Sequence, residues 1–203
     1  MRGKFIVFEG IDGCGKTTEL LLLSKYIFSK NKYNNIILTR EPYKLLKIRE
    51  LLNKIKSPYE KEKILIKLFI EDRKIHIKEI IKPALKRNFY VLSDRYKYST
   101  IAYQAAQGVD IKKLINLNKN FIIPDIVFII DVPVSLSLKR MLKEKRTKQK
   151  FENDINFLEK VRNNYLKLPL LFPNEKIYII DGTKRIEKVY NKIKSIYEKE
   201  IEK

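Results

Sequence analysis

The chain has 203 residues, of which 44% are hydrophobic and 33% charged, and its formal net charge is +20. This apolar content argues against an intrinsically disordered chain and predicts a single globular domain, residues 1–203. The single cysteine, Cys14, excludes an intramolecular disulfide and a cysteine-cluster metal site. The apolar run at 126–132 is too short to cross a membrane, so we expect a cytoplasmic protein without a membrane partner.

The positive charge raises the question of a nucleic-acid partner. Most of it is lysine spread along expected helices. Such a diffuse charge also attracts free nucleotides. We therefore expect no nucleic-acid partner, with nucleic-acid binding kept as the alternative.

The first expected strand, residues 4–9, leads into a glycine-rich stretch and then an apolar helix. The stretch has the P-loop spacing of glycine, four residues and Gly-Lys-Thr, and it consists of Gly10, Ile11, Asp12, Gly13, Cys14, Gly15, Lys16, Thr17 and Thr18. Its glycines let successive backbone N–H groups point at a polyphosphate, and Lys16 brings a cation to the terminal phosphates. The hydroxyl of Thr17 is placed to ligate Mg²⁺. These nine residues are predicted to bind ATP.

Cys14 lies among the inward-pointing N–H groups, two residues before Lys16. Such surroundings predict a lowered thiol pKa and sensitivity to oxidation. The alternative is a small residue that only fills space in the loop.

Thr39-Arg40-Glu41-Pro42 follows the second expected strand, residues 35–39. Pro42 ends the strand and favours an extended backbone at Glu41. Because parallel sheets bind ligands at the carboxyl ends of their strands, we expect Arg40 and Glu41 at a ligand-binding edge. The alternative is a polar turn with a solvated Arg–Glu pair.

A long helical stretch is expected over residues 59–87, with a break near Pro83. Phe69 and Arg73 are four residues apart and share one face, where a ring and a guanidinium can stack on a base and bind its edge. Taken alone, the pair also fits ordinary core and surface positions. His76 is the only histidine and has no metal or triad spacing around it, so we expect it at the surface or half buried.

The third expected strand, residues 89–93, delivers two charged side chains directly after it. Asp94 is a candidate ligand of Mg²⁺ or of its waters. Arg95 can clamp a phosphate with two parallel N–H groups.

Two polar stripes follow on the next expected helix. Ser99 and Tyr103 share one helix face, and Thr100 and Gln104 share the adjoining one. Polar stripes at the mouth of a parallel sheet predict a pocket.

The fourth and fifth expected strands, residues 126–132 and 176–180, complete an alternation of strands and helices. The alternation predicts an α/β protein with a five-stranded parallel sheet flanked by helices, the three-layer P-loop NTPase fold. Asp131 ends the fourth strand and is expected either near the P-loop or in a structural role. Five of the eight residues at 143–150 are basic. Taken alone, such a charge run fits a solvated loop.

These pieces, in this order, resemble the thymidylate kinase family. They are residues 8–18 (Phe-Glu-Gly-Ile-Asp-Gly-Cys-Gly-Lys-Thr-Thr), 39–42 (Thr-Arg-Glu-Pro), 68–73 (Leu-Phe-Ile-Glu-Asp-Arg), 94–96 (Asp-Arg-Tyr), Ser99-Thr100, Ala102-Tyr103-Gln104 and Pro124-Asp125 leading to Asp131. The resemblance is collinear and covers almost the whole chain.

The resemblance implies an enzyme that transfers the γ-phosphoryl group of ATP to dTMP, giving dTDP and ADP for dTTP synthesis, with Mg²⁺ and as a homodimer. It implies that Asp12 approaches the acceptor's sugar or phosphate, that Phe69 stacks on thymine, and that Arg73 reads the base edge. Tyr103 would crowd the 2′ position. The substrate-binding candidates are Asp12, Arg40, Phe69, Arg73, Arg95, Ser99, Thr100, Tyr103 and Gln104.

Family members carry either an arginine inside the P-loop or a glycine there and basic residues in the lid. The resemblance implies that residues 143–150 form the short basic lid of a nucleoside monophosphate kinase. Gly13 occupies the P-loop position, so the resemblance also implies that Arg146 of the lid reaches the transferring phosphate. The catalytic candidates are Lys16, Arg95, Arg146 and Asp12.

Two alternatives stay open. One is a nucleoside monophosphate kinase that takes UMP, CMP, AMP or a broad range of deoxynucleotides. The other is a P-loop ATPase stimulated by DNA or RNA.

Overall fold

The structure, a computed structural model, describes residues 3–143 and 154–202. Its strands are β1 (Lys4–Glu9), β2 (Ile36–Arg40), β3 (Tyr90–Asp94), β4 (Ile126–Asp131) and β5 (Ile177–Asp181). They form one parallel sheet in the order β2-β3-β1-β4-β5. The predicted α/β fold is confirmed, although β2, β3 and β5 begin and end one residue later than expected.

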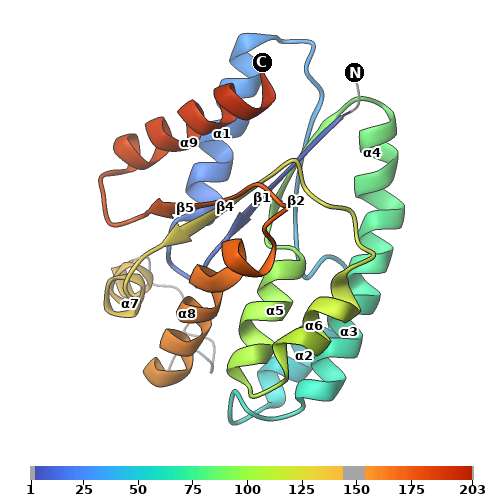
Figure 1. Ribbon diagram of the computed structural model, residues 1–203, viewed down its shortest axis with the longest axis vertical. Helices are drawn as coiled ribbons and strands as arrows, with labels where there is room; N and C mark the ends of the chain where they lie inside the picture. The colour runs from blue at the N-terminus through green and yellow to red at the C-terminus, as the bar shows by residue number, and fades with distance from the viewer. Residues whose placement is uncertain (1–2, 144–153, 203) are drawn as a thin grey trace.

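Helices cover both faces of this sheet, with α1 and α9 side by side on one face and α5 and α8 on the other (Figure 1). The helical elements are α1 (Lys16–Lys30), α2 (Leu46–Lys54), α3 (Glu62–His76), the π-helix η1 (Ile77–Ile81), α4 (Lys82–Lys86), α5 (Lys97–Ala106), α6 (Ile111–Asn118), α7 (Val134–Lys143), α8 (Ile155–Leu171) and α9 (Ile186–Ile201). None of the helices in the described residues is long and apolar enough to span a bilayer.

The two central strands carry the core. Residues 5–9 of β1 and 126–130 of β4 are buried without interruption. Continuous burial is what a parallel strand covered on both faces requires, and it explains why these strands read as unbroken apolar runs. The core therefore holds the carboxyl ends of the strands, and the loops that follow them, in fixed positions.

The predicted helix break at Pro83 is wrong. The chain runs from α3 through η1 into α4 (Figure 1). Pro83 lacks an N–H group, and in an α-helix its ring would clash with the carbonyl four residues earlier. The wider π turn accommodates the proline, since the N–H of Lys82 already bonds five residues back, to the carbonyl of Ile77.

The carboxyl ends of the strands bring the candidate site residues together. Asp94 at the end of β3 is in register with Phe8 of β1 on one side and with Arg40 of β2 on the other. The P-loop leaves β1 at this edge. Of the predicted lid, only Lys143 belongs to the described residues; Arg146 and the rest of 144–150 lie outside them.

Candidate active site

Three glycines shape the P-loop, with φ values of 135° at Gly10, 76° at Gly13 and 105° at Gly15. A Cβ on Gly10 would lie 2.6 Å from the carbonyl oxygen of Ile130, and one on Gly13 would lie 2.6 Å from that of Ser137 in α7. A side chain at position 13 therefore requires both a left-handed backbone and space that α7 occupies. The loop lies too close to its neighbours to accept an arginine there without a shift of α7.

The side chain of Lys16 is 6% exposed and folds over the loop. Its ammonium donates to the carbonyl oxygens of Gly10 at 3.1 Å and Ile11 at 2.9 Å. The cation thus lies inside the loop. This arrangement suits a polyphosphate.

Thr17 and Asp94 meet beside the loop, where the Thr17 hydroxyl donates to Oδ2 of Asp94 at 2.6 Å. Both are hard oxygen ligands of the kind that Mg²⁺ prefers, and Mg²⁺ uses few protein ligands when it also binds phosphates. Within residues 3–143 and 154–202, no group of three or more His, Cys, Asp or Glu side chains forms a metal cage. The pair fits a metal held jointly by the protein and a nucleotide.

The structure contradicts the redox hypothesis for Cys14. Its thiol is 1% exposed, and burial raises its pKa, an effect that outweighs the charge of Lys16. A buried, protonated thiol is a poor nucleophile. Cys14 is a space-filling residue of the loop.

Two cavities meet at the P-loop. One, of about 720 Å³, follows the loop and the start of α1, and the other, of about 450 Å³, lies between α3, α5 and α8. Asp12, Arg40 and Arg95 line both cavities. The two volumes suit two nucleotides whose phosphates face each other across these three residues.

The first cavity extends from the P-loop to residues 182–186, at the carboxyl end of β5. Arg140 of α7 lies along it and donates to the carbonyl oxygens of Cys14 at 3.3 Å and Gly182 at 2.8 Å. Sequence reasoning missed Arg140, because nothing in its helix distinguishes it from the surrounding basic residues. It ties the P-loop to the β5–α9 loop.

Arg95 is the centre of the junction between the cavities. Its Nη2 donates to Oδ1 of Asp12 at 2.7 Å, and its Nη1 donates to the hydroxyls of Ser99 at 3.0 Å and Tyr165 at 3.1 Å. Its guanidinium also lies 5.3 Å from the ring centre of Tyr103. These contacts fix the guanidinium at the mouth of the second cavity.

Two carboxylates near Arg95 have pKa values that are shifted in opposite directions. Burial alone would raise the pKa of Asp12, but the charges of Arg95 and Lys16 outweigh it and hold the pKa below its ordinary value. Glu9 is fully buried, and desolvation raises its pKa to about 7 despite the nearby charge of Arg95. Asp12 therefore stays ionised at neutral pH, whereas the pKa of Glu9 lies near neutrality.

Glu9 is a second residue that sequence reasoning missed. Its Oε2 accepts from the hydroxyls of Ser99 at 2.6 Å and Tyr165 at 3.1 Å, and its Oε1 accepts from the backbone N–H of Tyr96 at 2.7 Å. The only available signal was a carboxylate ending an otherwise apolar strand. Through the two hydroxyls, Glu9 supports Arg95.

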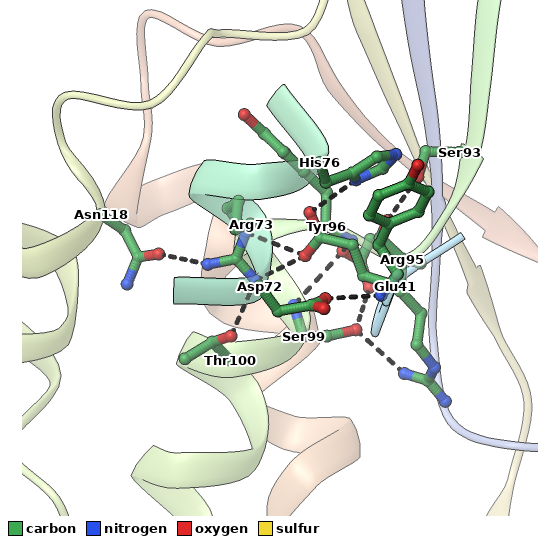
Figure 2. Close-up of polar contacts among 12 residues, drawn as sticks. Glu41, Asp72, Arg73, His76, Ser93, Arg95, Tyr96, Ser99, Thr100 and Asn118 are labelled. Atoms are coloured by element: carbon green, nitrogen blue, oxygen red, sulfur yellow. Dashed lines mark hydrogen bonds and ion pairs between the residues drawn. The ribbon is translucent and has the colours of Figure 1, made fainter. Parts of the chain in front are cut away.

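Arg73 lies in the wall of the second cavity and is 1% exposed. Figure 2 shows its contacts with Glu41, Thr100 and Asn118. Its Nε and Nη2 pair with Oε2 of Glu41 at 2.9 and 2.7 Å. Nη2 also donates to the hydroxyl of Thr100 at 2.9 Å, and Nη1 donates to Oδ1 of Asn118 at 2.7 Å. Four of the five N–H groups of a guanidinium are thus used. One Nη1–H remains available to a ligand.

An unmatched acceptor lies in the same wall. Oε1 of Gln104 is buried and has no hydrogen-bond partner among the described residues. Phe69 and Tyr103 also line this cavity. An aromatic ring, one donor from Arg73 and one acceptor from Gln104 together suit the edge of a planar base.

His76 and Asp131 lie outside both cavities. The surface or half-buried position expected for His76 is wrong: the side chain is 0% exposed and bonded to Glu41, which is itself buried and not part of a solvated pair. Asp131 takes the structural alternative, since Arg162 of α8 pairs with both of its oxygens at 2.6 and 2.9 Å. It does not line the P-loop cavity.

A parallel sheet with a P-loop after its first strand, joined to a second base-sized cavity, defines the P-loop kinases that act on nucleotides. The family model for thymidylate kinase matches residues 8–193. The sequence is similar to the thymidylate kinase of Thermosipho africanus, with 44% identity over 205 residues that cover 98% of this chain and 99% of the relative. It is 43% identical to the thymidylate kinase of a Sulfurihydrogenibium species over 93% of each chain.

The fold is similar to the crystal structure of thymidylate kinase from Ehrlichia chaffeensis, with a TM-score of 0.76 and 32% identity over 97% of this chain and 99% of the other. The chain belongs to the thymidylate kinase family. The family and the enzyme class expected from the sequence are thereby confirmed.

Proposed function

We propose that this chain transfers the γ-phosphoryl group of ATP to dTMP, giving dTDP and ADP. The observation that carries the proposal is the junction of two nucleotide-sized cavities at Asp12, Arg40 and Arg95, with a base-reading pair at the far end of the second cavity. Family membership supports the same reaction.

The P-loop cavity holds ATP in this proposal. Backbone N–H groups and Lys16 bind its β- and γ-phosphates, and the cavity continues toward residues 182–186, where the base would lie. Thr17 and Asp94 would hold Mg²⁺, which supplies charge neutralisation at the phosphates.

Arg95 and Arg40 hold the 5′-phosphate of the acceptor. That phosphate is already anionic, so its oxygen needs no general base to act as a nucleophile. Transfer then depends on holding the two phosphates in line and on neutralising charge. Asp12 pairs with Arg95 and orients its guanidinium toward the junction. Arg146 is proposed to bring the additional cation that Gly13 does not provide, and Lys16, Arg95, Arg146 and Asp12 are the proposed catalytic residues.

The base end of the cavity selects a pyrimidine with an oxo group beside an N–H. The remaining Nη1–H of Arg73 donates to a ring carbonyl, and Oε1 of Gln104 accepts from the adjacent ring N–H. Thymine offers this pair at O4 and N3. Cytosine offers an amino group and an acceptor there, which leaves both protein groups unmatched and costs ~1–3 kcal/mol for each. Phe69 stacks on the ring, and Thr100, Ser99 and Tyr103 complete the substrate-binding set.

The test is ADP formation with ATP and a panel of dTMP, dUMP, UMP, dCMP, AMP and GMP. The proposal predicts turnover that requires a monophosphate acceptor, with dTMP preferred over dCMP by at least ~10² in kcat/KM. Preference for AMP, UMP or dCMP would support another nucleoside monophosphate kinase. ATP hydrolysis stimulated by DNA or RNA, with a steep salt dependence, would support the nucleic-acid-stimulated ATPase.

The proposal treats residues 1–203 as one kinase domain. The homodimer implied by the family resemblance stays a prediction. Sedimentation equilibrium across a concentration range tests it directly.

A further inference from the structure

We propose that His76 is a positioning residue for base recognition: it fixes Glu41, which in turn fixes the guanidinium of Arg73. This inference rests on the proposed function, because it concerns how the base-reading side chain is held. His76 does not line either cavity, so it acts through Glu41 and not on the substrate.

The side chain of His76 is fixed on three sides. Its Nε2 lies 2.8 Å from the hydroxyl of Thr39, its Nδ1 lies 3.1 Å from Oε1 of Glu41, and its ring stacks on Tyr43 with centroids 4.8 Å apart and an interplanar angle of 18°. Since the carboxylate of Glu41 can only accept, Nδ1 carries a proton and donates. Thr39, on β2, thus anchors the imidazole, and the imidazole anchors Glu41.

Glu41 divides its two oxygens between two partners. Oε1 accepts from His76, and Oε2 accepts from Nε and Nη2 of Arg73 (Figure 2). Glu41 is 4% exposed, so bulk water has little access to its oxygens. Without the His76 donor, Oε1 becomes a buried acceptor with no partner, which costs free energy. Rotation of the carboxylate toward another donor recovers part of that cost. Rotation of the carboxylate shifts Arg73.

The position of Arg73 decides base selection because the guanidinium has one N–H left for a ligand. Asn118 and Thr100 hold its Nη atoms from α6 and α5, and the rings of Tyr96 and Phe121 lie 5.4 Å from its central carbon. Among the described residues, only Glu41 accepts a hydrogen bond from Nε. A shift of Glu41 therefore tilts the guanidinium plane and misaligns the remaining N–H with the base.

Two substitutions test this chain of contacts. His76→Phe keeps a flat ring that can stack on Tyr43 but removes both nitrogens. His76→Asn places an amide nitrogen about where Nδ1 lies and retains a donor for Glu41. Ile66→Ala, in the same helix, removes buried apolar volume without touching the cavity and serves as a control for lost stability alone.

We measure kcat and KM for dTMP, dCMP and ATP, together with thermal unfolding, for the wild type and all three variants. The proposal predicts that His76→Phe raises the KM for dTMP about tenfold and lowers the ratio of kcat/KM for dTMP to kcat/KM for dCMP about tenfold. The same variant changes kcat and the KM for ATP less than about threefold. His76→Asn restores most of the preference. Ile66→Ala loses thermal stability but keeps the preference.

Different results overturn the proposed function and the role of His76. A wild-type enzyme that does not phosphorylate dTMP overturns the proposed function. A wild-type enzyme that does, combined with unchanged base preference in His76→Phe, overturns only the role of His76. Failure of His76→Asn to recover preference, when it folds as stably as Ile66→Ala, likewise overturns that role.

Discussion

The substitution Glu9→Gln tests how a buried carboxylate supports the phosphate-binding arginine. Gln has the same shape as Glu, but one of its two terminal atoms donates hydrogen bonds. The Oε1 position faces the backbone N–H of Tyr96, which can only donate, so the amide oxygen must occupy it. The NH₂ group then faces the hydroxyls of Ser99 and Tyr165, at the Oε2 position.

Both hydroxyls lose Glu9 as their acceptor in that variant. In the wild type they donate to Glu9 and accept from Nη1 of Arg95, at 3.0 Å for Ser99 and 3.1 Å for Tyr165. The hydroxyls of Ser99 and Tyr165 lie 2.8 Å apart, so one of them can donate to the other. The second hydroxyl then turns its proton toward Arg95, where two donors meet. A hydrogen bond to a charged group contributes ~1.5–3 kcal/mol, so loss of one contact and strain on the other costs ~3 kcal/mol at most. The expected rise in the KM for dTMP is then ~10–10².

The assay is steady-state kinetics between pH 6 and 8, with KM for ATP in the same variant as the internal control. Because burial raises the pKa of Glu9 to about 7, the wild type protonates Glu9 as the pH falls, and its KM for dTMP should rise toward that of Glu9→Gln. The phosphate of dTMP itself titrates near ~6 in both proteins, so the ratio of the two KM values removes its effect. A KM for dTMP equal to that of the wild type at pH 8, or a ratio that does not change with pH, would refute the reasoning.

Three more predictions concern Lys16, Arg146 and Glu19. Lys16→Ala should lower kcat by ~10²–10³ with an unchanged circular dichroism spectrum, because the cation at the phosphates is lost; appreciable activity in this variant would refute the P-loop mechanism. Arg146→Ala should lower kcat far more than ATP affinity, whereas Lys143→Ala should not, and equal losses would remove the specific role of Arg146. Glu19 is 3% exposed, its Oε2 has no partner among the described residues, and burial raises its pKa from 4.5 to about 7. Ionisation of Glu19 therefore destabilises the folded state as the pH rises through this window, and Glu19→Gln should gain ~1–2 kcal/mol, discounted for screening, at pH 8 but not at pH 4.5. Differential scanning calorimetry at the two pH values checks this, and an equal shift at both contradicts it.

The sheet and the P-loop could be predicted because local pattern decides them. Buried parallel strands must be apolar on both faces, so the continuous apolar runs at 4–9 and 126–132 identify them as strands. The P-loop needs its glycines at a fixed spacing, which the sequence shows directly. The placement of Asp94 and Arg95 beside Arg40 followed from the rule that parallel strands end at one edge. These inferences need no knowledge of which side chains meet across the sheet.

The partners of the site residues could not be predicted, because they come from distant segments. Arg73 is fixed by Glu41 and Asn118, which lie 32 and 45 residues away. His76 carries no sequence signal of burial, and only its pairing with Glu41 and Thr39 makes a buried imidazole tolerable. The Pro83 break was wrong for a related reason, since a π turn can absorb a missing N–H where the rest of the helix is held by packing.

The second cavity is proposed to hold a pyrimidine monophosphate whose base edge hydrogen-bonds to Arg73 and Gln104. The most direct measurement is kcat/KM with ATP for dTMP and dCMP, with dTDP identified as the product. The account predicts dTDP formation and a preference for dTMP of at least ~10². Equal use of dCMP, or no transfer to dTMP, would contradict it.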